Sequence, residues 1–166
     1  METSIITYKY LYELDITDSF FDSLKQDYAD FESWFKKKQA ANAMAYVTET
    51  GGKLTSFLML KIENKSENYM DFLHPFKPAK RLKISTLKVM DTGKRIGEMF
   101  IKIIFKKAVE EQVDEIYITI FDKYKNLIDL LESYGFKKYT KKKTLGSNGK
   151  YLFENVLVKR YSYDTI

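Results

Sequence analysis

One stretch, residues 82–121, restricts the fold more than any other part of this sequence. Residues 82–90 alternate like a strand, and a loop follows from residue 91 to residue 97. Ile96 to Glu111 have the apolar periodicity of a helix, and residues 115–121 read as another strand. Strand, loop, helix and strand in this order indicate a crossover between two parallel strands. The sequence therefore predicts a fold that contains a pair of parallel strands.

The remaining elements favour antiparallel pairing. Gly51-Gly52 and the stretch 146–149 are hairpin signals, each between two strand-like segments. Asp18 or Ser19 can cap a first helix, and Gly135 is a left-handed cap for the last one. The expected strands are 5–12, 43–49, 54–62, 82–90, 115–121, 136–144 and 151–160. The expected helices begin near 20, 31 and 96, and the last one is read from the spacing of Leu127, Leu130, Leu131 and Tyr134. Residues 63–80 form an irregular connection with a short strand. The predicted order is β-α-α-β-β-β-α-β-α-β-β.

Composition excludes several classes of site. The chain has 166 residues, which suits one domain over 1–166. It has no cysteine, so disulfides, thiolate metal sites and cysteine nucleophiles are excluded. A single histidine, His74, excludes a multi-histidine metal site. We see no targeting segment and no membrane span, and we expect a cytoplasmic protein.

The net charge of +5 is unevenly distributed. Residues 1–83 hold 12 basic and 12 acidic side chains, whereas residues 84–166 hold 16 and 11. The basic half favours an anionic partner, either a nucleotide cofactor or nucleic acid. The first 35 residues, with 8 acidic and 2 basic side chains, favour a cationic partner. Ordinary solvent-exposed surface explains the basic second half and the acidic first 35 residues equally well. Because we find no nucleic-acid motif, a nucleic-acid-binding module is the least favoured function.

The loop before the third helix has the features of a phosphate site. Residues 92–97 read TGKRIG and open directly onto the helix. N–H groups at a helix N-terminus bind phosphate, and Gly93 and Gly97 allow close approach to the backbone. Lys94 and Arg95 add cationic side chains. A plain helix start would show the same pattern.

This segment resembles the pyrophosphate loop of the GNAT superfamily of acetyl-CoA-dependent N-acetyltransferases, Arg/Gln-x-x-Gly-x-Gly/Ala after Leu-x-Val. The matching residues are Leu87, Lys88 and Val89 at the strand end, Gly93, Lys94, Ile96 and Gly97 in the loop, and Gly135-Phe136 after the last helix. The resemblance implies an α/β (α+β) fold with a mixed, mostly antiparallel sheet of six to seven strands. It also implies a central parallel strand–helix–strand crossover, with helices on both faces. It further implies binding of acetyl-CoA by Leu87, Lys88, Val89, Thr92, Gly93, Lys94, Arg95, Ile96, Gly97 and Glu98.

The sequence departs from the family pattern at three positions. Thr92 replaces the usual Arg or Gln, and Arg95 replaces a Gly. Both changes are compatible with pyrophosphate binding by backbone N–H groups, and Arg95 can itself pair with a phosphate. Leu131 stands where many members have a tyrosine acid. A thiolate leaves without a proton more readily than an alkoxide, so this loss costs less than loss of the base or of the cofactor site.

Candidate catalytic groups follow from the chemistry of an amine attacking a thioester. The resemblance assigns the oxyanion donor to a backbone N–H of Lys88 or Val89. Tyr124 and Tyr134 are candidate acids. His74 is a candidate base, and so are the acidic residues near it, Glu63, Glu67 and Asp71. A lone histidine among aromatic residues more often has a structural role, and each tyrosine fits the core or the rim of the site at least as well.

The expected function is transfer of an acetyl group from acetyl-CoA to a primary amine of a protein or of a small molecule. Two alternatives remain open: a catalytically inactive acyl-CoA-binding or regulatory domain, and a toxin that acetylates aminoacyl-tRNA. The expected partners are the amine acceptor and, as in similar families, a second copy in a homodimer. No nucleic acid other than a tRNA substrate and no membrane partner are expected.

Overall fold

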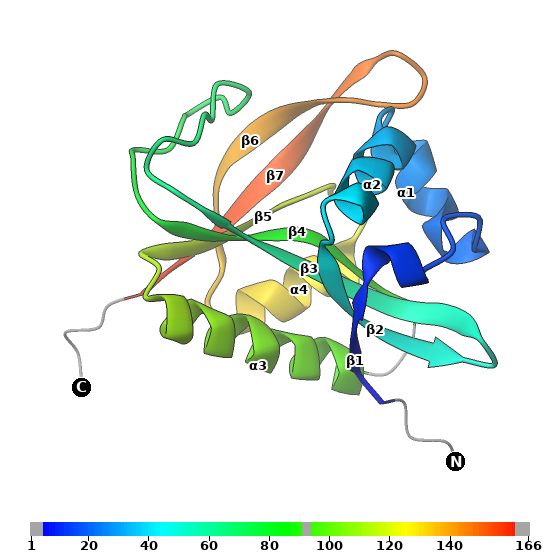
Figure 1. The fold of residues 1–166 in the computed structure, drawn as a ribbon. Helices are drawn as coiled ribbons and strands as arrows, with labels where there is room; N and C mark the ends of the chain where they lie inside the picture. Colours follow the sequence, from blue (N-terminus) through cyan, green and yellow to red (C-terminus); the bar gives the residue numbers. More distant parts are fainter. Residues whose placement is uncertain (1–4, 91–93, 162–166) are drawn as a thin grey trace. The chain divides into compact units, whose positions relative to one another are not determined.

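The computed structural model describes residues 5–90 and 94–161, and Figure 1 shows their secondary structure. The strands and helices follow one another in the predicted order. They are β1 (Thr7–Tyr10), η1 (Leu11–Glu13), η2 (Ser19–Phe21), α1 (Asp22–Asp27), α2 (Phe31–Ala40), β2 (Met44–Thr50), β3 (Lys53–Glu63), β4 (Arg81–Val89), α3 (Lys94–Glu111), β5 (Glu115–Ile120), α4 (Lys125–Ser133), β6 (Lys137–Leu145) and β7 (Tyr151–Arg160).

Seven strands are hydrogen-bonded in the order β1-β2-β3-β4-β5-β7-β6. β4 and β5 run parallel, whereas β1 with β2, β2 with β3 and β5 with β7 run antiparallel. The parallel register pairs Arg81 with Glu115 and ends with Ile84 opposite Ile118. The predicted mixed sheet with a parallel strand–helix–strand crossover is therefore confirmed.

The described residues group into two compact units, one drawn from 5–59, 86–90, 94–96 and 145–152 and the other from 60–85, 97–144 and 153–161. The first unit has an aromatic core, in which Phe21 contacts Phe31, Phe35 and Phe57 with ring centroids 5.1–5.9 Å apart. Aromatic side chains bury a large area each, so a few of them fill this core. Asp18 caps η2 by accepting a hydrogen bond from the Phe20 N–H, as predicted.

The first strand is shorter than predicted. β1 ends at Tyr10, and the chain then turns through η1 instead of continuing to residue 12. The Tyr10 N–H donates to the Glu13 carboxylate at 2.9 Å, and the Leu11 N–H donates to the Ala43 carbonyl. This turn buries Leu11 and Leu14 in the core of the first unit. Burial of these two leucines thus outweighs the strand preference of the neighbouring tyrosines.

In the second unit, α3 and α4 each bury one side. The fully or almost fully buried side chains of α3 are Phe100, Ile101, Ile104 and Ala108, which lie at helical spacing. After α4, Gly135 has φ +97°, the left-handed conformation predicted for it. Its N–H and that of Phe136 donate to the carbonyls of the last helical turn. The chain therefore leaves α4 directly into β6.

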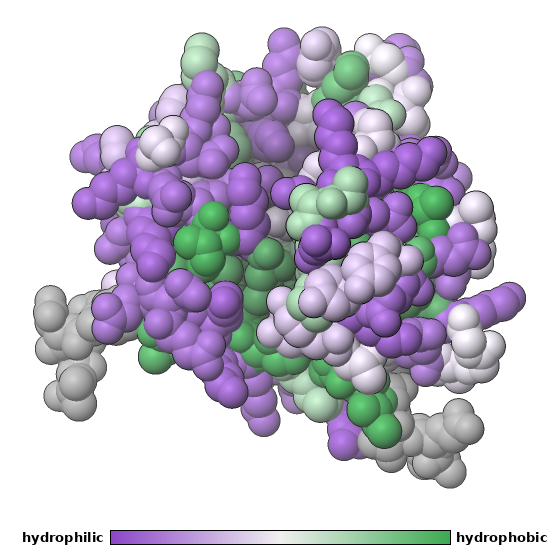
Figure 2. Space-filling model, in the orientation of Figure 1, coloured by the Kyte–Doolittle hydropathy of each residue, from purple (hydrophilic) through white to green (hydrophobic). Residues whose placement is uncertain are grey.

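Hydrophilic residues cover most of the face in Figure 2, and hydrophobic ones form small groups among them. Among the described residues, no helix is both long enough and apolar enough to cross a bilayer. The same residues contain no cluster of three or more His, Asp or Glu side chains that could hold a metal ion.

Candidate active site

Of the predicted cofactor segment, residues 87–98, the structure describes residues 87–90 and 94–98. Leu87, Lys88 and Val89 are half-buried and form the end of β4. The next residue, Met90, donates its N–H to the Thr55 carbonyl of β3 at 2.9 Å, which fixes the strand end. The predicted binding residues Thr92 and Gly93 lie outside the described residues.

The side chain of Lys88 holds the end of β4 against the first helices. Its Nζ donates to the Phe20 carbonyl and to the Ser23 hydroxyl, the latter at 2.7 Å, and lies 4.5 Å from the centre of the Phe20 ring. Burial lowers the pKa of Lys88, and the charges of Asp22, Asp27 and Asp18 oppose that change. The lysine therefore positions the backbone that the resemblance assigns to the oxyanion.

The first turn of α3 is electropositive. α3 begins at Lys94, the side chain of Arg95 is exposed, and the first turn contains no acidic residue. The macrodipole places a partial positive charge at this end, so cationic residues here disfavour the helix unless an anion binds nearby. Ile96 is buried, and Glu98 is exposed.

Gly97 is placed for close packing within the second unit. A Cβ atom built on Gly97 would lie 2.7 Å from the Cδ2 methyl of Leu130 in α4. Any side chain there would have to displace Leu130, so the absence of a side chain brings α3 and α4 together. This packing role is additional to the ligand approach expected for Gly97 from the sequence.

The two candidate tyrosine acids lie at opposite ends of α4. Tyr124 precedes the helix, is half-buried and has the Lys123 ammonium 5.3 Å from its ring centre. Tyr134 follows the helix, and its ring packs edge-on against Phe105 of α3 at 6.1 Å. Ten residues of helical rise place them about 15 Å apart along the axis. One reacting thioester can therefore contact only one of them.

His74 is exposed and lies beside β6. Its backbone N–H donates to the Thr140 hydroxyl at 3.0 Å, and its Nδ1 lies 3.3 Å from the same oxygen. The predicted short strand in the 63–80 connection is present as a single bridge between Phe72 and Lys142. These contacts place His74 against β6, the strand at one edge of the sheet.

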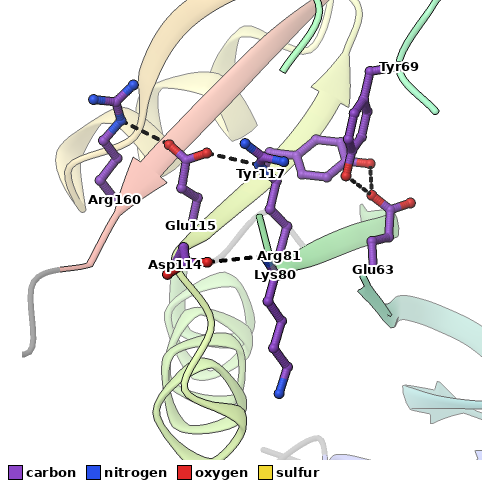
Figure 3. A network of polar contacts seen from close by, with 8 residues as sticks. All are labelled: Glu63, Tyr69, Lys80, Arg81, Asp114, Glu115, Tyr117 and Arg160. Atoms are coloured by element: carbon purple, nitrogen blue, oxygen red, sulfur yellow. Dashed lines mark hydrogen bonds and ion pairs between the residues drawn. The ribbon is translucent and has the colours of Figure 1, made fainter. Parts of the chain in front are cut away.

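Glu63, another candidate base, is buried in a polar cluster of the second unit (Figure 3). Its Oε1 accepts hydrogen bonds from the hydroxyl of Tyr117 and, at 2.9 Å, from that of Tyr69. Burial, and next the bond to Glu63, raise the pKa of Tyr117, and the same causes raise that of Tyr69 to about 12. Both tyrosines therefore remain protonated donors at neutral pH.

A charged ladder crosses three strands of the same unit (Figure 3). Glu115 accepts from Arg81 at 2.8 Å and from Arg160 at 2.8 Å. Arg81 is 3% exposed, and its guanidinium lies 4.1 Å from the centre of the Phe76 ring. Nearby on β4, burial and then the charge of Lys142 lower the pKa of Lys83, while Glu63 opposes that change.

Comparison with known proteins shows which fold these elements form. No family model matches the sequence, and no curated protein matches it. Solved structures match over almost their whole length. An N-acetyltransferase from Staphylococcus aureus Mu50 is 14% identical, with a TM-score of 0.66 and coverage of 96% of this chain and 99% of that one. A GCN5-related N-acetyltransferase from Rhodopseudomonas palustris is 17% identical, with a TM-score of 0.65 and coverage of 97% and 98%.

A third match is Arabidopsis thaliana Naa50 in complex with the bisubstrate analogue CoA-Ac-MVNAL. It is 16% identical, with a TM-score of 0.58 and coverage of 94% of this chain and 99% of that one. The chain has the GNAT fold. The structural matches establish the fold, and because the sequence identities are this low, the activity has to be tested separately.

Sequence reasoning missed two features of this GNAT fold. The side-chain contact of Lys88 with Phe20 and Ser23 joins residues far apart in sequence, and no local pattern announces it. The bonds from Tyr69 and Tyr117 to Glu63 were missed for the same reason. The only signal in the sequence for this cluster is one tyrosine, Tyr117, within the apolar strand 115–121. Leu131, which stands at the position that the resemblance assigns to a tyrosine acid, is completely buried and therefore belongs to the core.

Proposed function

We propose that this protein is an acetyl-CoA-dependent N-acetyltransferase that acts on a primary amine. The observation that carries the proposal is the GNAT fold, matched from end to end by N-acetyltransferases. One of the matched proteins, Naa50, was solved with an analogue that joins CoA to an acetylated peptide. The cytoplasmic location and the homodimer stay predictions.

The described residues fit a CoA pyrophosphate at the start of α3. An 18-residue helix begins there with cationic residues and without an acidic residue in its first turn. A bound pyrophosphate would offset the repulsion between these cations and the helix dipole. Backbone N–H groups of residues 94–97, together with the exposed Arg95, would hold it. Leu87, Lys88 and Val89 would line the adjoining part of the cofactor.

When bound, acetyl-CoA would supply an activated acetyl thioester. The N–H of Lys88 or Val89 would donate to the oxygen that becomes negative as the amine attacks. The amine must be neutral to attack, and an alkyl ammonium has a pKa of about 10.4, so the site must remove a proton. His74, Glu63, Glu67 and Asp71 remain the candidate bases, and Tyr124 and Tyr134 remain the candidate acids.

The test is isothermal titration of the full chain with acetyl-CoA and with free CoA. We expect micromolar binding, followed by thiol release when an amine acceptor is added. Arg95→Glu should weaken CoA binding by about tenfold, because it places a like charge beside the phosphates. Lys102→Glu, an equal charge change at an exposed position further along α3, is the matched control. Absence of binding at millimolar CoA would refute the proposal.

A second candidate function is acyl-CoA binding without catalysis. The observation that favours it is the complete burial of Leu131 at the position of the usual acid. A binding domain would take up CoA with the same sensitivity to Arg95→Glu. It would release no thiol with any acceptor in a panel of peptide N-termini, lysines, polyamines, amino sugars and aminoacyl-tRNA. Turnover with any one of these acceptors would exclude this alternative.

A further inference from the structure

The exposed side chains of β6 form a basic strip with an aromatic ring inside it. We define the β6 strip as Lys137, Tyr139 and Lys141, all exposed in the structure. Five of the seven residues from 137 to 143 are lysines, and none is acidic. Along the strand, residues 137, 139 and 141 point to the same side about 6.8 Å apart.

The lysines of the strip lack carboxylate partners. Within residues 5–90 and 94–161, no ion pair joins Lys137 or Lys141 to an acidic side chain. The Asp122 carboxylate accepts a hydrogen bond from Asn155 at 2.5 Å. This bond lowers the pKa of Asp122 most, and the charges of Lys141 and Lys138 lower it further. Unpaired like charges along one strand repel one another, so the strip favours an anion as its partner.

Tyr139 is anchored by an aromatic contact and is partly exposed. Its ring stacks on Phe76, with centroids 5.3 Å apart and planes 28° apart, yet the residue is 45% exposed. Phe76 in turn packs against Tyr117 at 5.2 Å and lies under Arg81. This aromatic stack anchors the tyrosine in the core of the second unit. Its uncovered ring surface is therefore a preordered platform at the protein surface.

The backbone edge beside the strip is partly occupied. The Leu73 N–H donates to the Lys141 carbonyl at 2.9 Å, and the Lys143 N–H donates to the Asp71 carbonyl at 2.9 Å. An added strand would compete with these bonds. The strip thus offers side chains, ammonium groups and one aromatic face for recognition.

We propose that the β6 strip binds a single-stranded nucleic acid, with the lysines at the phosphates and the Tyr139 ring stacked on a base. An acidic polypeptide could satisfy the lysines, but its carboxylates would gain nothing from the aromatic face. Stacking of bases on aromatic side chains, within a basic groove, is the usual chemistry of single-strand binding. The proposal is independent of acetyl transfer, since it uses none of the residues assigned to the cofactor.

The test is fluorescence anisotropy of the full chain with a labelled oligouridylate of about 12 nucleotides. Its salt dependence should be steep. The double variant Lys137→Gln and Lys141→Gln should lower the slope of log K against log salt by about 1.4, at about 0.7 for each lost phosphate contact. The matched control carries the same change on α2, at the exposed Lys36 and Lys37, and should keep the slope.

A second pair of variants tests the aromatic platform. Tyr139→Leu should weaken binding by about 5- to 100-fold, whereas Tyr139→Phe keeps the ring and should bind like the parent. Circular dichroism melting shows that each variant is folded. Binding of oligothymidylate equal to that of oligouridylate, or weaker, supports the proposal and reports whether the ribose contributes. The proposal is overturned by absent binding, by equal effects of the β6 and α2 double variants, by an unaffected Tyr139→Leu, or by polyglutamate binding as tightly.

Discussion

Removing one hydroxyl, by Tyr117→Phe, tests whether the Glu63 cluster stabilises the protein. Tyr117 is 2% exposed and Glu63 is 3% exposed, so water cannot easily replace a lost donor. The hydroxyl is one of two tyrosine donors to the same carboxylate oxygen. Hydrogen bonds to a charged group contribute about 1.5–3 kcal/mol. The substitution keeps the ring and its packing against Tyr69 and Phe72, so the loss reports on the hydrogen bond.

We expect Tyr117→Phe to lower the free energy of unfolding by about 1.5–3 kcal/mol in urea titrations followed by circular dichroism. For a chain of this size the melting midpoint should fall by roughly 3–12 °C. In a Glu63→Gln background the same change should cost about 0.5–1.5 kcal/mol, because the acceptor is then neutral. A loss below about 0.5 kcal/mol, or an equal loss in both backgrounds, would refute the argument that a charged acceptor makes the bond strong.

Three further predictions concern stability. The pKa of Tyr69 is raised to about 12, so the folded state keeps a proton that the unfolded chain releases near pH 10. Stability is complete below pH 10 and falls as the pH rises to 12, by about 1.4 kcal/mol per pH unit per tyrosine. Tyr69→Phe should show a shallower fall in urea titrations, and identical slopes would contradict this. Leu131→Ala should cost about 2–5 kcal/mol in the same titrations, because Leu131 is completely buried. It should leave CoA affinity unchanged, and a selective loss of turnover without a melting shift would argue for a catalytic role. Gly135→Ala should cost about 1–2 kcal/mol in thermal melts, because its φ of +97° disfavours a side chain; Ser133→Ala is the control.

The fold could be predicted from the sequence where local signals were strong. The β4–α3–β5 crossover followed from apolar periodicity, and Gly135 followed from its place after the last helical turn. β1 was predicted too long because propensity cannot show that Leu11 belongs to the core. Periodicity reports which residues are buried along one element, and it does not report which element they meet.

The candidate site could be predicted only in part, for the same reason. The resemblance identified the strand end at Val89 and the cationic start of α3. It could not show that Lys88 is anchored to Phe20, a residue 68 positions away. The resemblance also gave no reason to choose between Tyr124 and Tyr134 as the acid. The structure shows that α4 places these two residues far apart, at its opposite ends. Long-range contacts of single polar side chains leave no period in a sequence.

The strand order has a consequence for how the chain folds during synthesis. β5 is bordered by β4 on one side and by β7 on the other, and β7 comes more than 30 residues later, at 151–160. While the ribosome is still translating the segment between them, one side of β5 lacks its partner. An exposed strand of this apolar character is prone to non-native association. We infer that the newly made chain is prone to non-native association at β5 until β7 has left the ribosome and paired with it.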